Sequence, residues 1–129
     1  MKENKLELKI KELQNKINAP YNLIPEFNIS NDIARPFIDI GEGDIFYYVI
    51  KERGLEYERT LYRNEDELLY RVFKDVTFEI ATKYELENRN NDKDFRILLF
   101  KKQEELMSLL YLDWGIRIKS ENDRFLKIL

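Results

Sequence analysis

The sequence contains neither cysteine nor histidine. The absence of cysteine excludes disulfides, thiolate zinc sites and thiol nucleophiles. The absence of histidine removes the side chain that most often acts as a general base near neutral pH, and also the most common ligand of transition metals. The chain therefore lacks the residue types from which catalytic centres and metal sites are most often built.

Long hydrophobic runs and a basic charge balance are missing too. The apolar run at residues 45–50 is far shorter than the roughly 20 residues that a membrane helix needs. The charged segment Met1–Lys5 leads into no apolar stretch, so we expect no secretion signal and a cytoplasmic protein. A net charge of −3 is opposite in sign to that of most chains that bind nucleic acid. We therefore expect neither a nucleic-acid nor a membrane partner.

The composition that remains is that of a folded protein. The chain has 129 residues, of which 43% are hydrophobic, including eight Phe, eight Tyr and one Trp. This length fits one domain, and this apolar content is enough for one core and argues against disorder. We expect residues 1–129 to form a single domain.

Hydrophobic spacing predicts helices at both ends of the chain. Leu6, Ile10 and Leu13 recur at helical intervals within residues 4–18, and Pro20 ends this pattern. Three further helices are predicted after residue 63. Their expected starts are Asn64 as a cap, Asn91 or Asp92 as a cap, and Asp113.

The middle of the chain has the pattern of strands. Three strands are predicted at residues 37–40, 45–52 and 55–62, with a tight turn at Arg53-Gly54. The expected register pairs Lys51 with Glu56 and Ile50 with Tyr57, which places Tyr47 and Tyr57 on opposite faces. The residues before the first of these strands, 20–25, are expected to form an extended linker. The sequence thus predicts an α+β fold: an N-terminal helix, a three-stranded antiparallel meander at about 36–62, and three C-terminal helices packed on one sheet face.

The predicted sheet region also carries the acidic excess, since residues 20–62 hold twice as many acidic as basic side chains. We interpret these acids and two tyrosines as a surface for a protein partner, because charges steer association and aromatic side chains anchor interfaces. The candidate residues are Asp39, Glu42, Asp44, Tyr47, Glu52, Glu56, Tyr57 and Glu58. The alternative is a solvated sheet face on which Lys51 and Arg59 neutralise their neighbours.

Sites for catalysis or cofactors are not predicted. Asp39, Glu42 and Asp44 lie near a glycine-containing turn, but their spacing does not match a calcium-binding loop. The Glu56-Tyr57-Glu58 segment lacks the lysine that a hairpin nuclease of the Glu-x-Lys kind requires. We expect no catalytic residues, no metal and no cofactor.

Several blocks stand in order along the middle and the C-terminal half of the sequence: Tyr48, Val49, Glu52, Arg53, Gly54, Glu56, Arg59, Asp66, Glu67, Leu68, Leu69, Tyr70, Phe73, Val76, Thr77, Phe78, Ala81, Tyr84, Glu85, Arg89, Asp94, Phe95, Arg96, Leu99, Phe100, Gln103 and Trp114. Together these blocks resemble the Imm63 family of immunity proteins from bacterial polymorphic toxin systems. The segments 11–14 and 17–20 also fit the pattern, whereas residues 62–65 depart from the expected turn.

The resemblance implies a cytoplasmic, non-catalytic protein that neutralises a cognate toxin, such as a nuclease, by direct contact. Its partner would be the toxin domain, and the protein itself would be a monomer or a weak homodimer. Two other hypotheses remain open at this point. One is a regulatory or scaffold module that self-associates through its sheet face, and the other is an enzyme that uses paired carboxylates.

Overall fold

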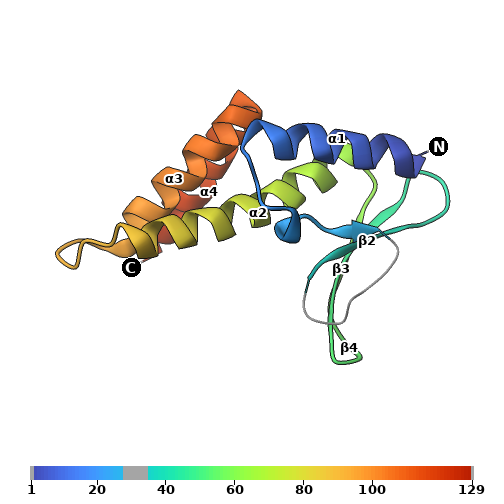
Figure 1. Ribbon diagram of the computed structural model, residues 1–129, viewed down its shortest axis with the longest axis horizontal. Coiled ribbons are helices and arrows are strands. Elements are labelled where there is room, and N and C mark those ends of the chain that lie inside the picture. Colours follow the sequence, from blue (N-terminus) through green and yellow to red (C-terminus); the bar gives the residue numbers. More distant parts are fainter. Residues whose placement is uncertain (1, 28–34, 129) are drawn as a thin grey trace. The chain divides into compact units, whose positions relative to one another are not determined.

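The computed structural model describes residues 2–27 and 35–128, and these form helices and one β-sheet (Figure 1). The predicted α+β class is confirmed. The elements in order are α1 (Lys2–Lys16), the 3-10 helix η1 (Tyr21–Leu23), β1 (Glu26–Phe27), β2 (Phe37–Ile40), β3 (Phe46–Glu52), β4 (Leu55–Tyr62), α2 (Glu65–Glu87), α3 (Phe95–Leu110) and α4 (Leu112–Ile128).

The described part of the sheet has four strands in the order β1-β2-β3-β4. The predicted antiparallel meander is confirmed for β2, β3 and β4. The prediction of three strands is wrong, because β1 adds a fourth strand that pairs parallel to β2. This strand has only two residues, too few to show an alternating pattern. The segment before it, expected to be extended, contains η1.

The β3–β4 hairpin turns at Arg53 and Gly54, as predicted. Both have positive φ, 52° and 78°, as the centre of a tight type I′ turn requires. The pairing of Lys51 with Glu56 is confirmed, but the pairing of Ile50 with Tyr57 is wrong. A β-bulge shifts the register at this point, so that Ile50 pairs with Glu58. Every later residue of β4 therefore lies on the face opposite to the predicted one.

The helix boundaries follow local chemistry. Asn64 caps α2, since its side-chain oxygen accepts the Glu67 backbone N–H at 3.2 Å. The cap of α3 is Asp94, not Asn91 or Asp92 as predicted. Its carboxylate accepts the backbone N–H and the guanidinium of Arg96, which hold the pKa of Asp94 at about 2. Asn90 instead accepts the backbone N–H of Asp92 in the preceding turn, which leaves the cap to the later aspartate.

The chain forms two compact units. The first, Met1–Gln14 with Pro20–Val72, contains most of α1, the sheet and the first turns of α2. Its buried apolar side chains include Leu6, Ile10, Leu13, Ile38, Tyr48, Val49, Leu68, Leu69 and Val72. The predicted apolar stripe of the first helix is thus buried. The single domain, and the packing of the C-terminal helices on the sheet, stay predictions.

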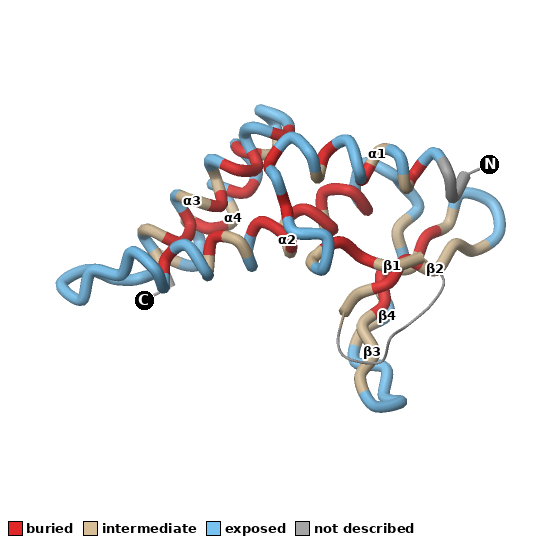
Figure 2. Tube along the Cα trace, viewed as in Figure 1, coloured by how far each residue is buried: buried red, intermediate tan, exposed pale blue. Residues whose placement is uncertain are grey.

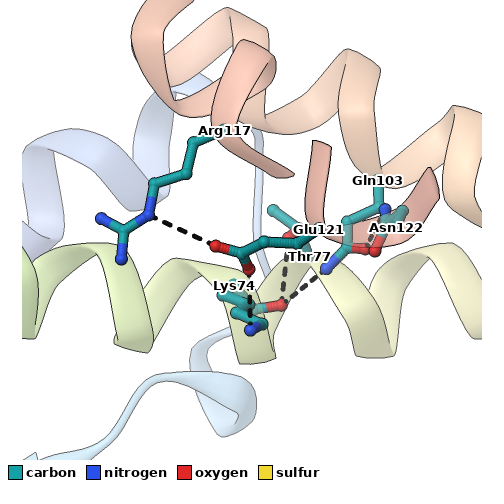
Figure 3. Close-up of polar contacts among 6 residues, drawn as sticks. All are labelled: Lys74, Thr77, Gln103, Arg117, Glu121 and Asn122. Atoms are coloured by element: carbon teal, nitrogen blue, oxygen red, sulfur yellow. Dashed lines mark hydrogen bonds and ion pairs between the residues drawn. The ribbon is translucent and has the colours of Figure 1, made fainter. Parts of the chain in front are cut away.

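The second unit, Asn15–Ala19 with Phe73–Leu129, contains the rest of α2 together with α3 and α4. Ala81, Leu99 and Phe100 form a buried apolar cluster against which Leu126 packs. The same unit contains a polar network shared by the three helices (Figure 3). Gln103 donates to the Lys74 carbonyl at 2.9 Å and accepts from the Asn122 amide at 3.1 Å. Among the described residues no buried side-chain nitrogen or oxygen lacks a hydrogen-bond partner.

Candidate functional site

The tip of the β3–β4 hairpin extends past the rest of the sheet. Within the described residues β2 pairs with β3 only along Phe46–Val49, so residues 50–58 form a two-stranded extension there, which we call the hairpin arm. Leu55 and Tyr57 on this arm are 62% and 64% exposed, and Figure 2 shows the exposed tip. Tyr57 is the extra residue of the bulge and has no opposite residue in the described register of β3. The arm therefore presents two large apolar side chains to solvent.

Three predicted site residues, Asp39, Tyr47 and Glu56, come together around Arg59. The Arg59 guanidinium donates to Glu56 at 2.8 and 3.3 Å and to Asp39 at 3.1 Å. It also lies over the Tyr47 ring, 5.3 Å from the ring centroid. The hydrogen bond from Arg59 lowers the pKa of Glu56 below its ordinary value. The alternative that Arg59 neutralises its acidic neighbours is thus supported by these contacts.

Glu58 does not lie with these three residues. The bulge turns it to the opposite face, where its carboxylate accepts two hydrogen bonds from Arg71 of α2, at 2.6 and 2.8 Å. The Arg71 guanidinium lies over the buried ring of Tyr48, 4.4 Å from its centroid. Glu58 therefore attaches the first turns of α2 to the sheet, and this contact leaves it a poor candidate for binding a partner.

We expect the Glu58–Arg71 pair to make folding sensitive to acid. The hydrogen bonds from Arg71 lower the pKa of Glu58 in the folded state. The pair therefore stabilises the fold above the carboxyl pKa of the unfolded chain, and this contribution is lost as the pH falls below about 4. Glu58→Gln should lower the free energy of unfolding by about 1 kcal/mol at pH 7, with the difference disappearing in acid.

Urea denaturation at pH 7 and at pH 3 measures this change. The matched control is Glu52→Gln, because Glu52 is also a partly buried glutamate of the same hairpin. A loss of stability in Glu58→Gln that is the same at both pH values would contradict the prediction.

The remaining predicted residues are scattered around the first unit. Glu42 and Asp44 are exposed in the turn between β2 and β3, and Glu52 is half-buried in the hairpin arm, opposite Leu55. The described residues contain no group of three or more acidic side chains placed to hold a metal ion. The structure thus brings Asp39, Tyr47 and Glu56 together and adds the exposed Tyr57 on the neighbouring arm.

Sequence reasoning missed two contributors to this surface. Arg59 was treated only as a neutralising neighbour, whereas it connects two strands through Asp39 and Glu56. Leu55 was not singled out, although an apolar residue directly after a glycine turn has few neighbours that could cover it. The hairpin turn was a signal for Leu55, which lies at its tip, whereas the position of Arg59 depends on the bulge, for which the sequence carries no local signal.

Comparison with known proteins identifies one family. The family model described as Immunity protein 63 (Imm63) matches residues 42–124, from the β2–β3 turn to the last part of α4. The matched segment includes the hairpin arm and Arg59. Neither a curated protein nor a solved structure matches the chain significantly. Within the described ranges, no helix is both long and apolar enough to span a membrane.

Proposed function

Because the chain belongs to the immunity protein 63 family, we propose that it neutralises a cognate bacterial toxin, such as a nuclease, by direct contact in the cytoplasm. The observation that carries this proposal is the family match over residues 42–124. The absence of cysteine and histidine also favours binding over catalysis, because a common nucleophile and the most common general base are missing. The protein then acts by occupying a surface of the toxin.

The hairpin arm is the surface that we assign to this contact. Interface energy comes mainly from a few large side chains that become buried, and Tyr57 and Leu55 are exposed and available for this. A standard interface covers about 800 Å² per partner. The arm and the neighbouring Arg59 cluster (Asp39, Tyr47, Glu56 and Arg59) together offer a continuous surface on one unit.

Charge plays a smaller part in this proposal than the acidic composition suggests. Asp39 and Glu56 share Arg59, and Glu58 pairs with Arg71, so two guanidinium charges offset two of the three carboxylate charges. Glu42 and Glu52 are further acids of this unit that can steer a basic toxin toward the arm. We therefore expect affinity to depend on the apolar anchors and the association rate to depend modestly on salt.

Co-expression tests the proposed function. We expect a large reading frame with a toxic C-terminal domain next to this gene, and the probe is that domain, produced with and without the chain. Growth of the host should be restored by the chain, and calorimetry with the purified domain should show a one-to-one complex. Continued toxicity without any measurable complex would overturn the proposal.

Replacing Tyr57 with alanine should weaken the complex by about tenfold, because one aromatic anchor is lost while the fold is preserved. The matched control is Tyr21→Ala in η1. Tyr21 is 73% exposed and lies outside both the arm and the family match. Calorimetric titration of both variants with the same toxin domain measures the difference, and equal affinities for the two variants would remove the arm from the interface.

A further inference from the structure

Strand β4 is the last strand of the sheet, and its outer edge is a row of backbone groups. Among the described residues, β4 pairs only with β3. Beyond the bulge, Glu58 to Tyr62 keep a regular register with β3, so the regular part of this edge is five residues long. An edge of this kind is a template on which another extended chain can pair.

The register shows which backbone groups point outward. The Gly41 N–H donates to the Ile45 carbonyl at 2.9 Å, so Gly41 and Ile45 are a hydrogen-bonded pair. Hydrogen-bonded and non-hydrogen-bonded pairs alternate along antiparallel strands. Counting in steps of two from Ile45, Tyr47 and Val49 therefore direct their backbone N–H and C=O groups toward β2. Tyr48, which lies between them, directs its N–H and C=O toward β4. Tyr48 pairs with Thr60.

The same alternation then applies along β4. Since Thr60 directs its backbone groups toward Tyr48, the neighbouring residues Arg59 and Leu61 direct theirs away from the sheet. Each of these two residues contributes one N–H donor and one C=O acceptor. The outer edge therefore carries two donors and two acceptors at the spacing of an extended strand.

Side chains beside the edge define which segment would fit. Leu61 is 41% exposed and lies on the same face as Tyr47, its partner in the register. Thr60 and Glu58 lie on the other face, which is polar here because Thr60 donates to Glu58 at 2.6 Å. A complementary segment has an apolar side chain beside Leu61 and polar side chains on the opposite face.

We propose that the outer edge of β4 receives an extended segment of the toxin as a fifth strand, with an apolar side chain packed beside Leu61. This inference rests on the proposed function and specifies how the partner is held. A second copy of the chain fits this edge less well. Antiparallel pairing of two β4 edges about Leu61 would set Arg59 opposite Arg63 of the other copy, and pairing about Thr60 would set Arg59 opposite Leu61, so either arrangement places a charge beside a like charge or an apolar side chain.

A pair of substitutions at Leu61 separates backbone pairing from side-chain contact. Leu61→Pro removes an outward N–H, a change that edge strands tolerate, whereas Leu61→Val keeps this N–H and a similar apolar side chain. Leu61→Pro should weaken binding of the adjacent-gene toxin domain by about 10- to 100-fold, because an acceptor of the toxin is left without its donor. Leu61→Val should stay within about threefold of the unchanged protein.

Circular dichroism and thermal melting establish that each variant is folded before its affinity is measured. If the unchanged protein binds the toxin domain and Leu61→Pro binds equally well, the edge-pairing inference is wrong while the proposed function stands. If the unchanged protein does not bind, the proposed function fails. A concentration-dependent dimer in sedimentation that Leu61→Pro abolishes would assign the edge to a second copy and overturn the inference.

Amide hydrogen exchange followed by NMR gives a test that needs no variant. In the free protein the Arg59 and Leu61 amides should exchange much faster than the Thr60 amide, which points toward β3. Addition of the toxin domain should slow exchange at Arg59 and Leu61 by at least about tenfold, as expected for new hydrogen bonds. Unchanged exchange at both amides in a saturated complex would contradict strand pairing, even if Leu61→Pro had weakened binding.

Discussion

Replacing Gly115 with alanine is expected to lower the free energy of unfolding by about 2–3 kcal/mol, the usual cost of overpacking. Gly115 is a buried residue in the first turn of α4. A Cβ atom at this position would lie 2.8 Å from the Cβ of Ser108 and 3.0 Å from its Cα on α3. The Ser108 hydroxyl can rotate away, but these two carbon atoms cannot move without shifting the helix.

The test is whether Gly115→Ala lowers or raises the free energy of unfolding. In an unobstructed helix, Gly→Ala stabilises by about 0.5–1 kcal/mol, since alanine has the higher helix propensity. Destabilisation at Gly115 therefore measures the close approach of α3 and α4, which lie side by side in Figure 1. The matched control is Ser120→Ala at an exposed position of the same helix, where a change within about 0.5 kcal/mol is expected.

Urea denaturation followed by tryptophan fluorescence measures these energies. Trp114, the only tryptophan of the chain, is adjacent to Gly115. Its ring contacts the Tyr111 ring edge to face, with 4.7 Å between the ring centroids. Combining Gly115→Ala with Ser108→Gly removes the Ser108 Cβ and should restore more than 1 kcal/mol relative to the sum of the two single changes. Additive effects, or a stabilised Gly115→Ala protein, would show that the helices are not in contact here.

The elements of the fold with strong local signals could be predicted from the sequence. The apolar stripe of α1, the Arg53-Gly54 turn and the Asn64 cap each depend on residues close together in the chain, and all three are confirmed. Strand β1 was missed because two residues pair through backbone groups alone, which leave no pattern of side chains. Local propensity therefore identified the elements, but not every pairing between them.

The residues of the candidate surface were harder to predict than the elements of the fold, because their positions depend on the register of β4. A single bulge residue, Tyr57, reversed the faces of everything after it in β4. Glu58 was consequently grouped with Glu56, although it bonds Arg71 on the opposite face. A one-residue shift in register cannot be predicted from an alternating sequence whose two faces are both partly apolar. Either register buries a similar set of apolar side chains.

Replacing Gln103 with leucine is expected to lower the free energy of unfolding of the second unit by about 2–3 kcal/mol. Gln103 is 2% exposed and connects three helices, because it donates to the Lys74 carbonyl of α2 and accepts from Asn122 of α4. Leucine has a similar volume, so the main loss is the hydrogen bonds and not the packing. The buried Asn122 amide then loses an acceptor in a place that water does not readily reach.

The double variant Gln103→Leu/Asn122→Leu distinguishes this cause from a simple loss of packing. Replacing both partners of a buried hydrogen bond by apolar groups can be nearly neutral, so the double variant should be more stable than Gln103→Leu alone. The control is Lys101→Leu, which changes an exposed position of the same helix and should alter stability by less than about 0.5 kcal/mol. Chemical denaturation of the unchanged protein, Gln103→Leu, Asn122→Leu, the double variant and the control measures the coupling. A double variant less stable than either single change would show that the hydrogen bond between Gln103 and Asn122 is not the source of the stability lost in Gln103→Leu. The expected recovery would show that the hydrogen bond between Gln103 and Asn122 couples α3 to α4 energetically.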